Sequence, residues 1–382
     1  MLTNQWPELV IQNFRVEKPI IQGGMGVGIS MSGLASAVAN AGGIGVISSV
    51  AIGLLDENTK MPFRTRNRNM LIREIRKARK LTSGVLGLNI MVAISDYDQL
   101  LQIAYDEEID IVFLGAGLPL KFSVNVTADR LRNAHTRVGV IVSSGRAAYL
   151  IFKSWQKNFR HIPDLVVVEG PMAGGHLGFK PEQIDDPRYA LEYLVPEVIA
   201  AVQPFEEIFE KNIPVIAAGG IYNGTDIYKF MRMGVQGVQM GTRFVATHEC
   251  DAAPQFKQSY VRCRKEDITI IESPVGLPGR AIRNRFLDEV TAGQKKPFKC
   301  PWKCLKTCDF REAPYCIAQA LTNAQKGNIE EGYTFAGSNA YRVNAIISVQ
   351  ELMDTLEREY IEAAVKAEAG KRARRETAFI SG

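Results

Sequence analysis

The stretch Leu165–Phe179, LVVVEGPMAGGHLGF, indicates what kind of fold the chain adopts. Its first residues, Leu165–Val168, form a continuous apolar run rich in β-branched side chains, which is typical of a parallel strand buried on both faces. The run ends in an acid, Glu169, and continues into a loop with four glycines and one histidine, His176. Loops of this kind, at the carboxyl ends of strands, carry the active sites of α/β barrels, so we interpret His176 as catalytic. A structural histidine in a glycine-rich turn is the alternative, and it is disfavoured because the chain holds only four histidines.

Other short apolar runs recur along the chain with helical stretches between them. The further predicted strands are Pro19–Gln22, Ile44–Ser48, Gly87–Met91, Ile111–Leu114, Val138–Val142, Ile213–Ala217 and Gly237–Met240. The predicted helices are Ser32–Ala41, Leu71–Leu81, Tyr97–Glu107, Ala147–Lys157, Glu192–Phe209 and Thr225–Met233, and the connector Val124–Asn133 has the weakest helical pattern. Strands that alternate with helices pair in parallel through right-handed crossovers. Eight such units predict an α/β fold of the TIM (β/α)₈ barrel type; a doubly wound sheet, the alternative, needs fewer strands.

The loops after the last two strands have the composition of a phosphate site. Gly219 and Gly220 follow the seventh strand, and Gly241 and Thr242 follow the eighth. In TIM barrels these two loops, with a helix N-terminus, commonly hold a phosphate, and Gly224–Asp226 has the pattern of a helix N-cap. Tight βα turns would also explain each loop singly, but the two together favour a phosphate. The glycine-rich run after the first strand, in contrast, lacks the spacing of a dinucleotide-binding fingerprint.

Composition limits the classes of function. The chain has 382 residues, of which 46% are hydrophobic, and a formal net charge of +5, which is too mild to indicate nucleic-acid binding. No apolar run is long enough for a transmembrane helix, and the N-terminus lacks the layout of a signal peptide, so we expect a cytoplasmic protein with no membrane partner. Six cysteines in a long, non-secreted chain argue against a disulfide scaffold.

Four motifs together resemble the nitronate monooxygenase (2-nitropropane dioxygenase) family, which includes the flavin-dependent enoyl-acyl-carrier-protein reductases. They are Pro19–Gly26, Ala41–Val46, Gly174–His176 with its flanks, and Pro214–Thr242, and the resemblance extends over roughly Pro19–Val245. It implies a TIM barrel that holds non-covalent FMN at its mouth and acts on a small-molecule substrate. It also implies that His176 is the base or proton-handling residue.

The resemblance assigns the remaining cofactor contacts residue by residue. Gly24 and Met25 would line the isoalloxazine ring, and Asn89 would contact it. The glycines of the loop after Glu169 would pass over the ring, and the last two loops would hold the phosphate. The complete set expected to bind the cofactor is Gln22, Gly23, Gly24, Met25, Asn89, Glu169, Gly174, Gly175, Ala218, Gly219, Gly220, Gln239, Met240, Gly241 and Thr242.

Beyond the barrel the chain contains a cluster of cysteines. Cys300, Cys304, Cys308 and Cys316 follow the pattern C-x₃-C-x₃-C-x₇-C, with prolines at Pro301 and Pro314. Zinc sites usually use two C-x₂₋₄-C pairs separated by a longer spacer, whereas three close cysteines and a fourth are nearer to iron–sulfur ligation, although no standard ferredoxin spacing matches. We therefore favour an iron–sulfur cluster over zinc and over unligated or redox-active thiols.

These features predict three regions. Residues 1–260 form the FMN-binding barrel, 261–345 form a charged, loop-rich insert or lid that carries the cysteines and returns to the barrel mouth, and 346–382 form a C-terminal helix and tail. The insert contains a predicted helix over Ile317–Lys326 and a loop, Gly332–Arg342, in which Ser338 and Asn339 are candidate contacts to cofactor or substrate. The helical tail, Val349–Arg375, either closes the barrel or forms a partner interface such as that of a homodimer.

The sequence thus predicts an FMN-dependent oxidoreductase, with oxidation of alkyl nitronates by dioxygen as the leading function. An NAD(P)H-dependent flavin reductase of enoyl thioesters or quinones is the alternative enzyme, because nicotinamide rather than the substrate would then reduce the flavin. A non-catalytic flavin or iron–sulfur redox sensor is the alternative from another class.

Overall fold

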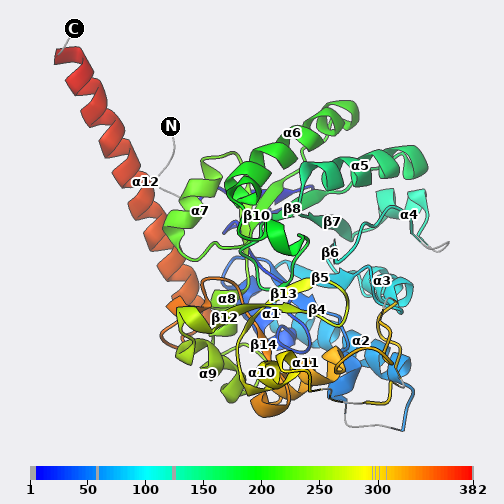
Figure 1. The fold of residues 1–382 in the computed structure, drawn as a ribbon. Helices are drawn as coiled ribbons and strands as arrows, with labels where there is room; N and C mark the ends of the chain where they lie inside the picture. Colours follow the sequence, from blue (N-terminus) through cyan, green and yellow to red (C-terminus); the bar gives the residue numbers. More distant parts are fainter. Residues whose placement is uncertain are drawn as a thin grey trace.

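The barrel of this protein is built from eight parallel strands. The strands are paired in the order β3-β11-β10-β8-β7-β6-β5-β4 (Figure 1). The computed structural model describes residues 6–56, 60–122, 126–294, 296, 298–300, 302–306 and 308–380, with side chains as far as Gly370. Hydrogen bonds from Ile44 N–H to the Ile20 carbonyl and from Gln22 N–H to the Ile44 carbonyl join the first barrel strand to the residue before the second and close the ring. The strands are β3 (Ile20–Gln22), β4 (Gly45–Ser48), β5 (Leu86–Met91), β6 (Ile111–Gly115), β7 (Arg137–Val142), β8 (Leu165–Glu169), β10 (Val215–Ala218) and β11 (Gly237–Met240). This topology confirms the predicted TIM barrel.

Alternation of side chains along the strands makes two apolar layers. Val167 lies inside the barrel with Phe113 and Ile216, whereas its neighbours Val166 and Val168 pack outward against the surrounding helices. All three valines of β8 are completely buried. Burial on both faces explains why the strand sequences are continuously apolar.

Helices surround the barrel at nearly all the predicted places. They are α1 (Ser32–Asn40), α2 (Phe63–Leu81), α3 (Tyr97–Asp106), α4 (Ala128–Asn133), α5 (Gly145–Phe159), α6 (Leu191–Phe209), α7 (Gly224–Met231) and α8 (Thr242–Val245). Helix α2 begins eight residues before the predicted start, at Phe63, because its charged first half still buries Phe63, Arg66 and Asn67. Part of the connector Val124–Asn133 lies outside the described residues, and α4 forms its second half.

A short hairpin near the N-terminus, not predicted from the sequence, covers the amino ends of the strands. Strands β1 (Leu9–Ile11) and β2 (Phe14–Val16) pair in antiparallel fashion. Leu9, Ile11 and Val16 join the apolar interior of the barrel and are almost completely buried. The hairpin thus closes the end of the barrel opposite the strands' carboxyl ends, where loops can form a site.

The insert is more regular than the sequence suggested. Helix α9 (Pro254–Arg262) leads into it, and it comprises β12 (Ile268–Glu272), β13 (Pro278–Ile282), α10 (Arg285–Thr291), α11 (Ile317–Gln325) and β14 (Thr334–Phe335). Strand β13 is central, and it pairs with β12, with β14 and with β9 (Gly175–His176) from the loop after β8. Short 3₁₀ helices lie in the insert at Lys265–Asp267, Ile329–Glu331 and Ala340–Arg342, and in the barrel region at Ile52–Leu55, Pro181–Gln183 and Pro187–Tyr189. The loop that carries His176 is therefore part of the insert's sheet.

The C-terminal helix, α12 (Val349–Ile380), packs along α7 and then projects away from the barrel (Figure 1). Leu352, Met353 and Leu356 on its first turns are completely buried. The first part of the predicted tail is therefore a component of the barrel wall. Within the described residues, no helix combines the length and the apolar character needed to cross a bilayer.

Candidate active site

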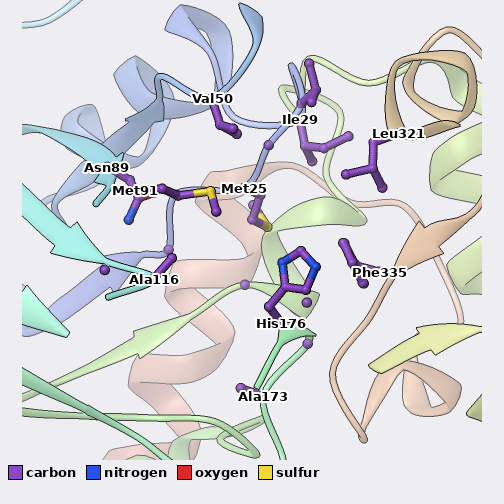
Figure 2. Close-up of a pocket in the computed structure, with 18 of the residues that line it drawn as sticks. Met25, Ile29, Val50, Asn89, Met91, Ala116, Ala173, His176, Leu321 and Phe335 are labelled. Atoms are coloured by element: carbon purple, nitrogen blue, oxygen red, sulfur yellow. The ribbon is translucent and has the colours of Figure 1, made fainter. Parts of the chain in front are cut away.

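One pocket opens at the carboxyl ends of the strands, between the barrel and the insert. Its walls come from the loops after β3, β5, β8, β10 and β11 and, across the opening, from α11 and β14. Figure 2 shows His176 among Met25, Phe335 and Ala173, with Asn89 and Met91 on the other side of the cavity. The pocket is therefore composite, and the insert supplies one side of it.

The pocket gathers nearly all the residues that the sequence predicted. It is lined by Gly23, Gly24, Met25, Asn89, Glu169, Gly174, Gly175, His176, Ala218, Gly219, Gly220, Gln239, Met240, Gly241 and Thr242. Gln22 does not line it: its completely buried side chain accepts a hydrogen bond from Val46 N–H (3.0 Å) and donates one to the carbonyl of Gly23. Gln22 thus holds the first strand within the barrel rather than reaching the cavity.

The insert fixes the position of the His176 imidazole. The main chain of His176 pairs with that of Gly279 in β13. The imidazole Nε2 lies 2.7 Å from the Oγ of Ser273, which is in the turn between β12 and β13. The ring of Phe335 approaches it edge-on, with centroids 5.0 Å apart. Burial lowers the pKa of His176 to about 4, so the imidazole is neutral at physiological pH.

Glu169 shows the opposite effect of the same environment. It ends β8, and its side chain faces the pocket. Burial raises the pKa of this carboxyl to about 7, because a charged carboxylate is poorly solvated there. At neutral pH Glu169 can therefore hold or release a proton.

Arg280 of β13 ties the loop after β8 to the insert. Its Nη1 donates hydrogen bonds to the carbonyls of Ala173 (2.8 Å) and Pro171, and the side chain is buried. Two main-chain oxygens of the loop thereby have a hydrogen-bond donor from the insert. Neither Arg280 nor Ser273 stood out in the sequence, because both lie in the insert, far along the chain from the loop they contact.

The loop after β10 comes very close to its neighbours. Gly219 and Gly220 have φ of +92° and +89°, and a Cβ at Gly219 would lie 2.7 Å from the carbonyl oxygen of Gly170. Only glycine fits this conformation without strain. No side chain of these two glycines therefore covers the main chain where the loop borders the cavity, so a ligand can approach it closely.

The insert completes this end of the pocket. Asn339 Nδ2 donates to the carbonyl of Gly220 (2.7 Å), and Gly337 N–H donates to Thr242 Oγ1 (3.2 Å). Between them, Ser338 Oγ is buried, and among the described residues it has no hydrogen-bond partner. Ser338 does not line the pocket, whereas Gly337 and Thr242 do, so a ligand at this end of the cavity would meet the latter two residues.

The predicted helix N-cap lies one residue earlier than expected. Asn223 caps α7 by accepting a hydrogen bond from Asp226 N–H (2.8 Å), and Glu359 of α12 accepts one from Gly224 N–H (2.8 Å). Gly224, Thr225 and Asp226 do not line the pocket. The N–H groups that face the cavity are thus those of the loops after β10 and β11.

At the other end, the loop after β3 leaves room for a flat group. A Cβ at Gly24 would lie 2.3 Å from the Cβ of Asn89, so the strand end and this loop are in direct contact. Gly23, Gly24 and Met25 all border the cavity, as does Met91. Small residues beside flexible methionines can accommodate a planar ring.

The four clustered cysteines lie in the insert, and one of them borders the pocket. Cys304 lines the cavity, and its carbonyl accepts a hydrogen bond from Ser95 N–H (3.0 Å) in the loop after β5. Pro301 and Thr307 are outside the described residues. In the described ranges, no three side chains of His, Cys, Asp or Glu surround a point as a single bound metal ion would require.

Comparison with known proteins identifies relatives over nearly the whole chain. The sequence profile of the family described as nitronate monooxygenase matches residues 8–359. A protein of Bacillus subtilis named "Probable nitronate monooxygenase" is 25% identical over 379 residues, which cover 91% of this chain and 97% of that protein.

Solved structures resemble this one closely. FabK from Thermotoga maritima matches with a TM-score of 0.71 and 27% identity, covering 93% of this chain and 96% of that one. Nitroalkane oxidase from Streptomyces ansochromogenes matches with a TM-score of 0.69, covering 92% and 98%; at 23% identity this likeness shows the fold alone.

Proposed function

This chain belongs to the nitronate monooxygenase family of flavin-dependent oxidoreductases, and we propose that it binds FMN and oxidises alkyl nitronates with dioxygen. The observation that carries the proposal is a pocket at the carboxyl ends of the strands that is lined by glycine main chain; the neutral, fixed imidazole of His176 in it would convert a nitroalkane into the nitronate. Bound FMN would take electrons from the substrate and pass them to dioxygen. The protein supplies binding, orientation and the handling of protons.

The residues present fit FMN at both ends of the pocket. The phosphate would be held by N–H groups of the loops after β10 and β11 and by the hydroxyl of Thr242. The flat ring would lie between the loop after β3, with Gly24 and Met25, and the loop after β8. The main chain can approach the cofactor closely on both sides, because glycines line both loops.

His176 would act as a base on the carbon next to the nitro group. When its Nε2–H donates to Ser273 Oγ, the lone pair is on Nδ1, which has no other partner in the described part of the chain. The imidazole is already neutral above about pH 4, so it is ready to accept a proton from a neutral nitroalkane. A nitronate has already lost this proton and needs no base.

The difference between the two substrates gives a direct test. In His176→Asn, turnover of nitroethane should fall by about 10²–10⁴-fold, because a general base contributes about that much. Turnover of ethyl nitronate should fall far less, and the flavin absorbance should be retained. In the wild type, the nitroethane rate should rise as the pH increases through about 4, since the imidazolium must lose its proton to act as a base. This rise should be absent in the variant.

Two results would contradict the proposal. If the wild type turned over neither compound, nitronate oxidation would be the wrong reaction. If it turned over nitroethane and His176→Asn did so equally fast, the reaction would stand but the base would be another group.

The similarity to FabK supports a second candidate, an NAD(P)H-dependent reductase of enoyl thioesters or quinones. The two functions differ in what reduces the flavin. Mixing the protein with NADH, NADPH or ethyl nitronate without oxygen separates them. Rapid loss of flavin absorbance with a nicotinamide, and none with the nitronate, would favour the reductase.

A further inference from the structure

The segment with the four cysteines is attached to the barrel at the edge of the pocket. Leu305 forms an antiparallel bridge with Ile94 in the loop after β5, and Lys306 N–H donates to the carbonyl of Ala93 (3.0 Å). Lys306 Nζ also donates to the carbonyl of Val92 (3.0 Å). The bridge and the Lys306 N–H bond are main-chain contacts, so they fix the path of the segment regardless of its side chains. The proposed reaction uses none of the cysteines.

The four thiols are close neighbours. Cys300, Cys304, Cys308 and Cys316 are all partly buried and unpaired by disulfides. Burial, together with the nearby thiols of Cys316, Cys300 and Cys308, raises the pKa of Cys304 to about 12. Cys316 is affected in the same way by Cys300 and Cys308, and Cys308 by Cys300. All six pairs of the four thiols thus interact, although the chain between the first and the last is 17 residues long.

The thiols also share an apolar environment beside the pocket. Cys304 and Cys316 pack with Trp302 around Phe63 and Ala318. Cys304, Phe63 and Ala318 line the pocket themselves. Two of the four cysteines thus pack against one apolar cluster at the pocket wall, and the four thiols are near enough to one another to share a single bound group.

We propose that Cys300, Cys304, Cys308 and Cys316 bind an iron–sulfur cluster at the wall of the flavin pocket. Four cysteine thiolates are the usual ligands of such clusters, and a partly apolar, partly accessible setting suits them. The spacing C-x₃-C-x₃-C-x₇-C gathers the ligands on one short segment and brings Cys316 back from the start of α11.

The arrangement of the thiols favours a cluster over a single zinc ion. Tetrahedral zinc holds its sulfur ligands at about 2.3 Å, which brings all four thiolates into contact around one point. Among the described residues, no three side chains of Cys, His, Asp or Glu surround a point as one zinc ion would require. In a cluster each cysteine can bind a different iron atom, so the thiolates stay further apart than around one ion.

The proposal is tested on the full-length protein purified without air. Iron and acid-labile sulfide should be present in equal amounts, about 2–4 of each per chain, with a broad absorbance shoulder beside the flavin bands. Reduction with dithionite should change the paramagnetism of the cluster, as seen by electron paramagnetic resonance. If purification strips the cluster, anaerobic incubation with ferrous iron and sulfide should restore it.

Matched variants separate ligation from general damage. The double variant Cys300→Ser, Cys308→Ser should lose iron and sulfide to background while retaining flavin absorbance. Cys263→Ser, which changes a buried cysteine outside the cluster whose Sγ donates to the carbonyl of Arg264 (3.3 Å), should keep both. Zinc without iron, no metal even after reconstitution, or equal iron in the double variant would each overturn the proposal. None of these results depends on His176 or on the substrate.

Discussion

Two titratable side chains in the pocket have their ordinary pKa order reversed. Burial lowers the pKa of His176 to about 4 and raises that of Glu169 to about 7. Between these values the imidazole is neutral while the carboxyl carries a proton. When an environment pushes two groups apart in this way, it separates a base from an acid. At the scale of single residues, burial thus makes His176 the group that can accept a proton and Glu169 the group that carries one.

The hydroxyl of Ser273 should act through His176. Ser273→Ala removes the 2.7 Å contact to Nε2, so the imidazole loses the partner that selects its tautomer. We expect kcat for nitroethane to fall by about 3–10-fold, the usual contribution of one hydrogen bond, with little change in KM. Steady-state kinetics with both substrates measure this effect.

The serine variants distinguish positioning from structural support. Ser273→Thr keeps a hydroxyl and should recover most of the lost rate. Turnover of ethyl nitronate should be unchanged in both variants, because that substrate needs no base. An equal loss with nitronate in Ser273→Ala would mean that the serine supports the loop rather than the imidazole.

At the scale of elements, local sequence predicted the barrel strands but not the pairings of the insert. The barrel strands carry their own signal because burial on both faces demands continuous apolar runs. The two-residue strand β9 has no such signal in its own sequence, because it forms only by pairing with β13. Ser273, the hydrogen-bond partner of His176, is 97 residues away from it in the chain. The pocket's glycines could be predicted because they follow strand ends. The partners of His176 could not, because only tertiary structure brings them there.

The loop after β10 should tolerate no side chain at Gly219. Alanine there would need φ near +92° and would press its Cβ against the carbonyl of Gly170, 2.7 Å away. Relieving this contact moves the N–H groups proposed to hold the phosphate, so Gly219→Ala should weaken FMN binding by about tenfold or more, for a strain of about 1–3 kcal/mol. Titration of the apoprotein with FMN measures the change.

A second glycine provides the control for this prediction. Gly293 also has a positive φ, +83°, but a Cβ there meets nothing within 4 Å. Gly293→Ala should cost about 1 kcal/mol of stability and leave the FMN affinity unchanged. If Gly219→Ala bound FMN as tightly as Gly293→Ala, the proposed phosphate position would be wrong.

At the scale of the whole molecule, the two ends of the chain meet outside the barrel. The ring of Trp6 stacks on that of Tyr360 of α12 at 4.6 Å, and Lys18, next to the first strand, pairs with Glu357 at 2.8 Å. Glu359 reaches Gly224 at the start of α7. The first half of α12 therefore joins elements that are far apart in the sequence, and none of these contact residues lines the pocket.

This arrangement predicts that α12 stabilises the barrel without taking part in binding. Leu356→Ala should lower the free energy of unfolding by about 2–5 kcal/mol, because Leu356 is completely buried and the change leaves a cavity. Val365→Ala, on the same helix at 46% exposure, should change it by less than about 0.5 kcal/mol. Denaturant unfolding measures both, and the FMN affinity of the folded proteins should match the wild type. If the two variants were equally stable, α12 would be an appendage; if Leu356→Ala weakened FMN binding in the folded protein, the helix would be coupled to the pocket through α7.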